Sequence, residues 1–356
     1  MKKIYIIVAA LFMCFITVSC GDNNSKKAEV FYHTYSADEN SEQLRISLNE
    51  AFDDDKIKYA NYNADMKTDT QINQIEKVFK DNSAVVAVSV VPNSSREDIF
   101  KIADMAKSSD VPLLFFGNEI NSDVLDKYNK ILYVGTDEKS AAQMQGKMIG
   151  DYLTQNYELT DLNGDGRISY VMLKGHYNNS VSELRTKLSV DTADGILAKQ
   201  GKPAIEYFDS GSENHYYTSE DGSLNSDGAY NYVKKILETY NEQNYNMIEL
   251  IVANTDEQAL GAISALQEAG YNTSRGNKII PVFGVDATAK AQSAIYAGIM
   301  TGSVRHDTGV MAEIIAEICE NIIEEDPVLD GIDQKYIAEK NRIIVPCKKY
   351  YGKKNI

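Results

Sequence analysis

The chain has 356 residues, 25% of them charged, and a formal net charge of −16 at pH 7. This acidic balance argues against nucleic acid and anionic membrane surfaces as partners, and the length is sufficient for two α/β domains. Outside the N-terminal segment the sequence contains two cysteines, Cys319 and Cys347, and nothing in the sequence pairs them, so it does not describe a disulfide scaffold.

The N-terminus predicts a lipoprotein signal peptide. Two lysines precede an apolar run from Ile4 to Val18, and Cys20 follows shortly after it. The run is too short to span a bilayer as a mature anchor. We expect residues 1–19 to be removed, Cys20 to be acylated, and residues 20–27 to tether the domain to the membrane, on the outer face of the cell or in the periplasm. An ordinary secretory signal with an incidental cysteine is the alternative.

Short apolar runs alternate with amphipathic stretches along the rest of the chain. Apolar residues recur at helical spacing between the runs, as at Ile99, Ile102 and Ala106. Apolar strands separated by helices predict parallel sheets that are covered on both faces. The candidate strands are Val30–Tyr32, Ile57–Tyr59, Ala84–Val91, Pro112–Phe116, Ile168–Leu173, Ala204–Phe208, Leu250–Ala253, Ile280–Val285 and Ile343–Val345.

Such repeats can form one closed barrel or two open, doubly wound sheets. Polar residues follow several strands, as Asn118, Asp256 and Asp286 do. Open sheets bind ligands at the carboxyl ends of their strands, so we predict two Rossmann-like lobes. Residues 212–227, rich in Tyr, Ser, Gly, Asn and Asp, form an unusual loop that we expect to overhang a binding site.

The stretch Asp161–Ser169 reads as the first nine positions of a calcium loop. Asp161, Asn163 and Asp165 supply oxygens at positions 1, 3 and 5, and Arg167 offers its carbonyl at position 7. Position 12, where an EF-hand has its bidentate Glu, is Met172. The loop therefore needs a carboxylate from elsewhere in the chain. A solvated, Asx-rich turn that binds no metal is the alternative.

Five segments together resemble the galactose/glucose branch of the bacterial periplasmic sugar-binding family. The resemblance runs from about Ala28 to Pro346, and the calcium loop after a YVGTD segment is specific to that branch. The segments are Tyr133–Asp137 (YVGTD), Asp161–Ser169, Leu173–Gly175 (LKG), Glu249–Asp256 (ELIVANTD) and Ile280–Asp286 (IPVFGVD).

This resemblance implies a structural calcium site. The carboxylate that the loop lacks would come from Glu249, and Ser169, which stands where the family has Gln, would act through water. Hard oxygen ligands in this number suit Ca²⁺ over Mg²⁺. The implied ligands are Asp161, Asn163, Asp165, the Arg167 carbonyl, Ser169 and Glu249.

The resemblance also implies a monosaccharide site between the lobes. Arg185 matches the family's guanidinium donor, and Asp286 matches its carboxylate acceptor; such charge-assisted bonds are about twice as strong as neutral ones. Other positions depart from the family, and the stacking Trp is absent, because the chain has no Trp. The remaining candidates are Asp38, Asn118 beside Gly117, Asn179, Thr255, His306, and Tyr216 or its neighbours His215 and Tyr217 for stacking.

These departures argue that the ligand is not simply glucose or galactose bound in the family's way. Val181, for example, replaces an acceptor Asp, and an unpaired sugar hydroxyl would cost about 1–3 kcal/mol on burial. The site is expected to take a galactose- or glucose-like monosaccharide or a related solute.

The resemblance implies lobes that are discontinuous in sequence. The N-terminal lobe would comprise residues 28–136 plus 306–341, and the C-terminal lobe residues 137–305 plus 342–356. Ligand contacts with both lobes would favour closure, and the closed form would deliver its ligand to the permease and ATPase of an ABC importer, with the lipid keeping the protein near that partner.

Three other classes of protein have requirements that can be compared with this sequence. A sugar-responsive transcription regulator needs a helix-turn-helix module where the signal and tether stand. An enzyme needs a catalytic constellation, yet the four histidines are scattered and no G-x-S-x-G, zinc spacing or phosphate loop is present, so we expect no catalysis. A sensory receptor that reports to a chemoreceptor or sensor kinase remains the alternative to transport.

Overall fold

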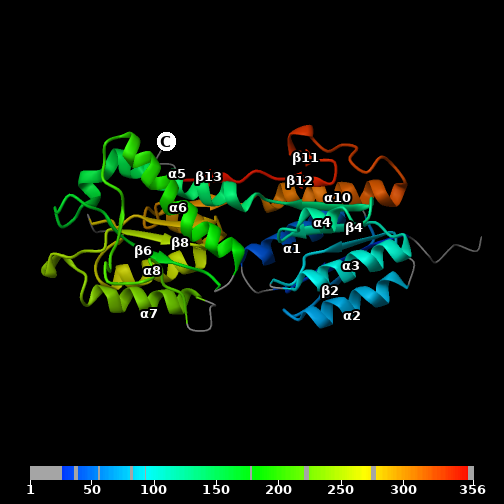
Figure 1. Cartoon of the computed structure of the whole chain (residues 1–356), viewed down its shortest axis with the longest axis horizontal. Helices are drawn as coiled ribbons and strands as arrows, with labels where there is room; N and C mark the ends of the chain where they lie inside the picture. Colours follow the sequence, from blue (N-terminus) through cyan, green and yellow to red (C-terminus); the bar gives the residue numbers. More distant parts are fainter. Residues whose placement is uncertain are drawn as a thin grey trace, which may run out of the picture.

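The computed structural model describes residues 26–35, 39–54, 57–80, 83–92, 94–176, 179–219, 224–273 and 278–351. Two α/β lobes lie side by side along the long axis of the molecule (Figure 1). Each lobe has one central, mostly parallel sheet with helices packed on both faces. The predicted fold class, two Rossmann-like lobes, is confirmed. None of the helices in the described ranges is long and apolar enough to cross a membrane.

The first lobe is built on a seven-stranded sheet in the order β11-β12-β5-β4-β3-β1-β2. Only the β11–β12 pair is antiparallel among the pairings of this sheet. Its strands are β1 (Ala28–Tyr32), β2 (Tyr59–Asn63), β3 (Val85–Val88), β4 (Leu113–Gly117), β5 (Ile131–Gly135), β11 (Ile337–Glu339) and β12 (Arg342–Ile344). Its helices are α1 (Glu39–Asp54), α2 (Thr68–Phe79), α3 (Arg96–Ser109), α4 (Ser122–Leu125), α10 (Thr308–Glu324) and the 3₁₀ turn η2 (Gln334–Tyr336).

The second lobe is built on a six-stranded sheet in the order β13-β10-β9-β8-β6-β7, in which β13 pairs antiparallel with β10. Its strands are β6 (Ser169–Leu173), β7 (Glu206–Tyr207), β8 (Leu250–Ala253), β9 (Val282–Asp286), β10 (Gly302–Arg305) and β13 (Lys348–Tyr350). Its helices are α5 (Glu138–Thr160), α6 (Ser180–Lys199), α7 (Ser226–Leu237), α8 (Asp256–Glu268), α9 (Ala289–Tyr296) and the 3₁₀ turn η1 (Glu242–Asn244).

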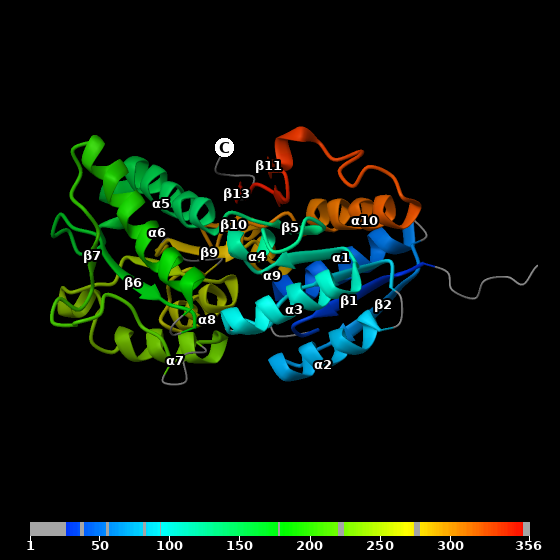
Figure 2. The same cartoon turned by 45° about the vertical axis from the view of Figure 1, so that its right-hand side comes forward.

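Alternation along the strands divides each core into two layers. In β1, Val30 and Tyr32 point to the layer that α1 and α10 cover, whereas Phe31 points to the layer of α2 and α3. Figure 2 shows α10 and α2 on opposite sides of this sheet. In the second lobe, α7, α8 and α9 cover one face and α5 and α6 the other. Burying each large apolar side chain contributes roughly 1.5–3 kcal/mol.

The helix α3 illustrates how local sequence sets an element. The Ser95 side chain accepts a hydrogen bond of 3.1 Å from the Asp98 N–H, and the Asp98 carboxylate accepts one from the Ser95 N–H, which is a capping box. The apolar positions Ile102, Ala103 and Ala106 then face the sheet, as their spacing predicts. The helix ends at Asp110, which adopts a left-handed conformation with φ of 55°.

Several predicted strands differ in extent from those observed. The strand expected at Ile57 begins at Tyr59, because the Ile57 N–H bonds back to the Phe52 carbonyl and closes the end of α1. The run expected over 84–91 pairs only over Val85–Val88. The strands β5, β10, β11 and β13 were not among the candidates; β11 and β13 have only three residues each, too short for a periodicity signal.

The third passage between the lobes lies later than expected. We assigned residues 342–356 to the C-terminal lobe, but β12 pairs in parallel with β5 of the first sheet, and the Val345 N–H bonds to the Gly135 carbonyl. Ladder hydrogen bonds therefore hold residues 342–345 to the first lobe. The chain then joins the second sheet at β13, and this last segment is drawn in red in Figure 1.

Candidate functional site

A buried group of charged and polar side chains lies where the chain passes between the lobes. Glu138 opens α5 directly after the first passage, Arg185 comes from α6, Asp286 ends β9, and His306 follows β10 at the second passage. We call these four residues the hinge cluster. Arg185 is 8% exposed and His306 is 6% exposed, so both side chains are largely removed from solvent.

The guanidinium of Arg185 is the centre of the hinge cluster. Its Nη2 donates to Glu138 Oε2 at 2.9 Å, and its Nε lies 3.3 Å from the same oxygen. Its Nη1 donates to the backbone carbonyl of Asn254 at 2.9 Å and lies 3.9 Å from Asp286 Oδ1. A buried guanidinium needs such partners, since an unpaired buried charge is very costly.

His306 completes the cluster in its neutral form. Its Nε2 lies 3.3 Å from Arg185 Nη2, and since a guanidinium can only donate, Nε2 accepts that bond. Its Nδ1 therefore carries the proton and faces Cys347 Sγ at 3.5 Å. Burial lowers the pKa of His306 to about 4, against the opposing effect of the Glu138 carboxylate.

Glu138 is held in its ionised form. Burial alone would raise the pKa of its carboxyl, but the adjacent Arg185 guanidinium outweighs burial, and the pKa is lowered to about 2. The second carboxylate oxygen accepts a hydrogen bond of 3.1 Å from the Thr136 hydroxyl. Glu138 thus links the guanidinium to the first passage between the lobes.

The backbone at Asp286 is strained. Its φ is 111°, and that of the next residue, Ala287, is 50°. Non-glycine residues rarely adopt such values, and consecutive outliers persist only where the surrounding structure imposes them, commonly at ligand sites. The strain turns the chain sharply at the carboxyl end of β9, beside Arg185.

Of the predicted ligand residues, Arg185, Asp286 and His306 come together, and others serve local structure. Asn179 caps α6 by accepting from the Ser182 N–H at 3.0 Å, and Thr255 caps α8 within a capping box. Asn118 donates to the Val90 carbonyl at 2.7 Å. Tyr216 lies under the ammonium of Lys174, 4.1 Å from the ring centroid.

Two predicted features of the ligand site are not fully covered by the described residues. Asp38 lies outside them, and so do residues 220–223 of the 212–227 loop. The same holds for Cys20 and the signal segment 1–19.

Sequence reasoning missed Glu138 and Cys347. Glu138 directly follows the YVGTD segment, one residue after the N-cap Asp137 of α5, and its position at the first passage was the available signal. Cys347 precedes β13 and carries no pattern of its own.

The carboxyl edge of the first sheet is also polar. His33 follows β1, and its Nδ1 lies 2.9 Å from the Ser89 hydroxyl after β3. Both are buried. Since these residues and Asn118 all stand at carboxyl ends of neighbouring strands, they share one edge of the first sheet, where open α/β sheets bind ligands.

The predicted calcium loop joins α5 to β6 and is closed by Glu249. Glu249 Oε1 accepts from the backbone N–H of Leu162 at 2.6 Å and of Asn163 at 3.2 Å, and Oε2 accepts from the Ser169 N–H at 3.1 Å. Asp161 accepts backbone bonds from Gly164, Asp165 and Gly166. The Ser169 hydroxyl donates to the Met247 carbonyl.

The side chains expected at the calcium site carry oxygen donors, the type that hard cations prefer. Glu249 is 1% exposed, and burial, together with the nearby Asp161 carboxylate, raises its pKa to about 7. In the part of the chain described, no three His, Cys, Asp or Glu side chains are placed together as a metal-binding group. The other expected ligands are oxygens of Asn163, Ser169 and the Arg167 backbone.

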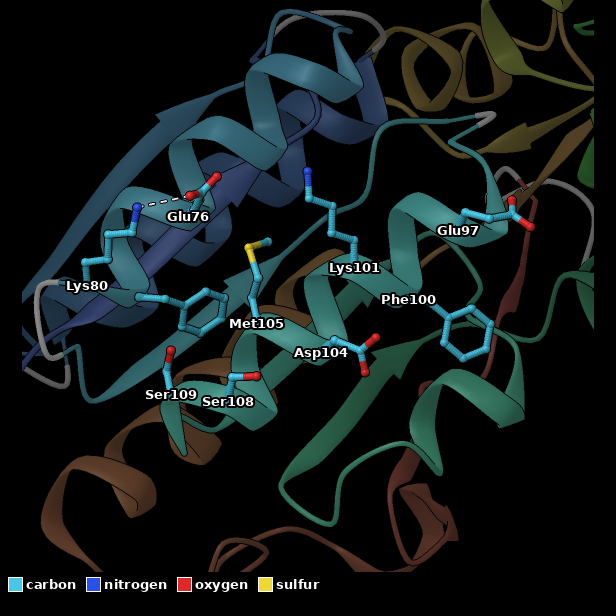
Figure 3. Close-up of a pocket in the computed structure, with 10 residues that line it drawn as sticks. Glu76, Lys80, Glu97, Phe100, Lys101, Asp104, Met105, Ser108 and Ser109 are labelled. Atoms are coloured by element: carbon cyan, nitrogen blue, oxygen red, sulfur yellow. Dashed lines mark hydrogen bonds and ion pairs between the residues drawn. The ribbon is translucent and has the colours of Figure 1, made fainter.

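Two surface pockets lie away from the hinge cluster. One, of about 530 Å³, lies between α2 and α3 and is lined by charged residues and by Phe79, Phe100 and Met105. Figure 3 shows Lys80 and Glu76 paired across one turn of α2, at 3.0 Å, beside this pocket. The other, of about 420 Å³, is lined by Phe208, Tyr217, Tyr232 and Tyr240 among others. Neither includes a residue of the hinge cluster.

Comparison with known proteins agrees with this architecture. The chain is 28% identical over 263 residues, 73% of its length, to the D-galactose/methyl-galactoside binding periplasmic protein MglB of Haemophilus influenzae, of which it covers 70%. An ABC transporter periplasmic solute binding protein from Actinobacillus succinogenes 130z with bound D-allose has a similar structure, with a TM-score of 0.68, 16% identity, and coverage of 92% of this chain and 97% of that one.

A second similar structure is an ABC transporter solute binding protein from Bacillus halodurans C-125 with bound myo-inositol. Its TM-score is 0.66 at 17% identity, covering 93% of this chain and 96% of that one. At these identities the structures support the fold alone. The family described as periplasmic binding protein domain matches residues 30–327, and the chain therefore belongs to the periplasmic binding protein family.

Proposed function

We propose that this chain is an extracytoplasmic binding protein that captures a sugar or related polyol between its lobes and delivers it to an ABC importer. The observation that carries the proposal is the buried Arg185 guanidinium, 3.9 Å from Asp286, at the ligand-binding edge of the second sheet. A donor next to an acceptor suits vicinal hydroxyls.

The range of ligands extends beyond galactose and glucose. The similar proteins named above bind, by their names, galactosides, allose and myo-inositol. All are uncharged polyols with several hydroxyls, and the hinge cluster offers the groups that such ligands share. The 212–227 loop would supply the ring that stacks on the ligand, with Tyr216, whose ring lies against the Lys174 ammonium, as the first candidate.

Calorimetric titration with a panel of neutral monosaccharides and inositols tests this function. Wild-type protein is expected to release or absorb heat with at least one member, and Asp286→Ala with none, because the acceptor is removed. Asp191→Ala is the matched control, since Asp191 lies on the surface of α6 and pairs with Lys187 at 2.5 Å. Silence of the wild type across the panel would overturn the proposed ligand class.

We also propose that Asp161, Asn163, Asp165, Arg167, Ser169 and Glu249 hold a structural Ca²⁺. When bound, the cation would offset the charge of the carboxylates that meet there. The support is the buried Glu249 carboxyl, which reaches the loop from the position just before β8 and accepts hydrogen bonds from the backbone N–H groups of Leu162, Asn163 and Ser169.

Attachment through Cys20 is the remaining part of the proposal. The lysines, apolar run and cysteine of the N-terminal segment support it. A lipid anchor would hold the binding domain near its membrane partner and raise its effective concentration there. Metabolic labelling with a radioactive fatty acid tests it, and Cys20→Ala should lose the label.

A further inference from the structure

We infer that Glu138 is a positioning and specificity-determining residue of the proposed site: it neutralises Arg185, so that the site takes uncharged polyols and excludes their anionic derivatives. The inference rests on the proposed function, since it concerns the ligand of the same site. The support is the set of partners that Arg185 has and the number of charges around it.

Most N–H donors of the Arg185 guanidinium already have an acceptor within the protein. A guanidinium has five N–H groups. The Nε donor and one on Nη2 are directed at Glu138, the other Nη2 donor at His306, and one Nη1 donor at the Asn254 carbonyl. The remaining donor is on Nη1, and among the described residues Asp286 is the charged group beside it, at 3.9 Å.

A ligand group at the remaining Nη1 donor must also suit the Asp286 carboxylate beside it. A ligand group that bonds to Nη1 comes next to the Asp286 carboxylate. A hydroxyl satisfies both neighbours, because it accepts from Nη1 and donates to the carboxylate. A carboxylate or phosphate of a ligand only accepts, so it would leave Asp286 facing another anion at short range, which is repulsive.

The net charge of the hinge cluster also disfavours an anionic ligand. The hinge cluster carries two carboxylates against one guanidinium, and His306 adds no charge because its neighbours require it to be neutral. Glu138 provides the second of these carboxylates and is itself closely engaged, with one oxygen on Arg185 and the other on Thr136. Without its charge the guanidinium and Asp286 would balance within the hinge cluster, and the cluster itself would exert no net repulsion on an anion.

Glu138→Gln tests the inference, because it removes the charge and keeps the shape and an acceptor oxygen. Glu158→Gln is the matched control: it makes the same change on the same helix, at an exposed pair with Lys202. Glu138→Ser removes the same charge with a smaller side chain and serves if the glutamine variant lacks a cooperative melting transition. All are made in the full mature chain.

Two probes are used. The first is calorimetric titration with neutral hexoses and with their uronates. The wild type should prefer the neutral sugar, and Glu138→Gln should shift this preference toward the uronate by roughly tenfold or more, as expected for removal of a close like charge. The second is sodium sulfate against sodium chloride at equal ionic strength, with the melting temperature as readout.

Sulfate should raise the melting temperature of Glu138→Gln more than that of the wild type or of Glu158→Gln. The wild type and Glu158→Gln should respond equally, and their response measures the general effect of the salt on stability. If a neutral sugar binds but neither the uronate preference nor the sulfate response changes in Glu138→Gln, the inference is wrong and the proposed function stands. If no sugar binds while the sulfate response appears, the role of Glu138 stands and the proposed function is wrong.

Discussion

The Glu249 carboxylate accepts a hydrogen bond of 2.6 Å from the backbone N–H of Leu162, 87 positions earlier in the chain. Glu249 immediately precedes β8, in the interior of the second sheet, and Leu162 lies in the loop before β6. A side chain of the sheet core therefore fixes the conformation of a surface loop. This relationship leads to the first prediction.

Glu249→Gln should abolish a calcium-dependent rise in melting temperature. The wild type, stripped with a chelator and then given Ca²⁺, is expected to melt at a higher temperature, since a ligand that binds the folded state stabilises it. The glutamine keeps an acceptor for the loop's N–H groups but loses the charge that a cation needs. Glu206→Gln, an exposed neighbour that pairs with Arg167, should keep the rise. A rise of wild-type size in Glu249→Gln would refute the calcium assignment.

His306 should make stability depend on pH. Its pKa is lowered from 6.5 to about 4 in the folded protein, so between these values the unfolded chain binds more protons and folding is penalised. The contribution is present in full above pH 6.5 and is lost as the pH falls through about 4; a shift of this size corresponds to about 3 kcal/mol.

Denaturant titrations between pH 4 and pH 7 measure this effect. His306→Gln should remove the His306 component from the profile, because its amide does not titrate, while His215→Gln should leave the profile unchanged, since His215 stacks on Tyr207 at the surface loop. The Glu138 carboxyl, with its pKa lowered to about 2, acts in the same direction but below pH 4.5, so the two effects occupy different ranges. Glu249, whose pKa is raised to about 7, contributes a slope of the opposite sign over this range to both proteins, so the test is the difference between the wild type and His306→Gln. Identical profiles for these two proteins would contradict the prediction.

Asp286→Gly should be more stable than Asp286→Ala by about 1 kcal/mol, because glycine adopts the φ of 111° without strain and alanine does not. Both variants lack the carboxylate, so both should lose ligand binding. Chemical denaturation compares the stabilities, and calorimetry compares the binding. Equal stabilities would show that the backbone relaxes at this position and that no strain is stored there.

Gly261→Ala should destabilise the second lobe, because a methyl group there would lie 2.1 Å from the Ser226 carbonyl oxygen, where α8 crosses the start of α7. Such a close approach costs about 1–3 kcal/mol when the backbones must separate. Gly195→Ala on α6 is the control: a methyl group there meets no atom within 4 Å, and alanine favours a helix over glycine by roughly 1 kcal/mol. Thermal denaturation should move the two variants in opposite directions.

The sequence predicted the elements whose pattern is long or chemically distinct. The apolar spacing at Ile102, Ala103 and Ala106 predicted α3, and the run Leu250–Ala253 predicted β8 with its observed ends. The short strands β11 and β13 were not predicted, because three residues are too few to show an alternation of apolar and polar side chains. Their pairing also depends on which neighbouring strand is present. The end of the first lobe was misplaced for the same reason, since the β12–β5 ladder sets it.

The predicted residues of the candidate site also fall into two groups, those that cluster together and those that have a local structural role. The resemblance to the sugar-binding family selected Arg185, Asp286 and His306, and their side chains lie together. Asn179 and Thr255 were selected by the same reasoning, yet both side chains cap helices. Whether a polar side chain at a strand end faces a ligand or its own helix depends on local hydrogen bonding, which sequence alone leaves open.

By itself, then, the sequence determined the two-lobed α/β class and the oxygen-rich loop at 161–169, which depend on composition and spacing, both local properties. The resemblance to the sugar-binding family added the expectation of a guanidinium and a carboxylate for a ligand. The tertiary structure alone decided that Glu138 neutralises Arg185, that His306 is held neutral against Cys347, and that Glu249 reaches Leu162. Each of these contacts joins residues far apart in the chain, and only the packing of α5, α6 and the second sheet brings them within hydrogen-bonding distance.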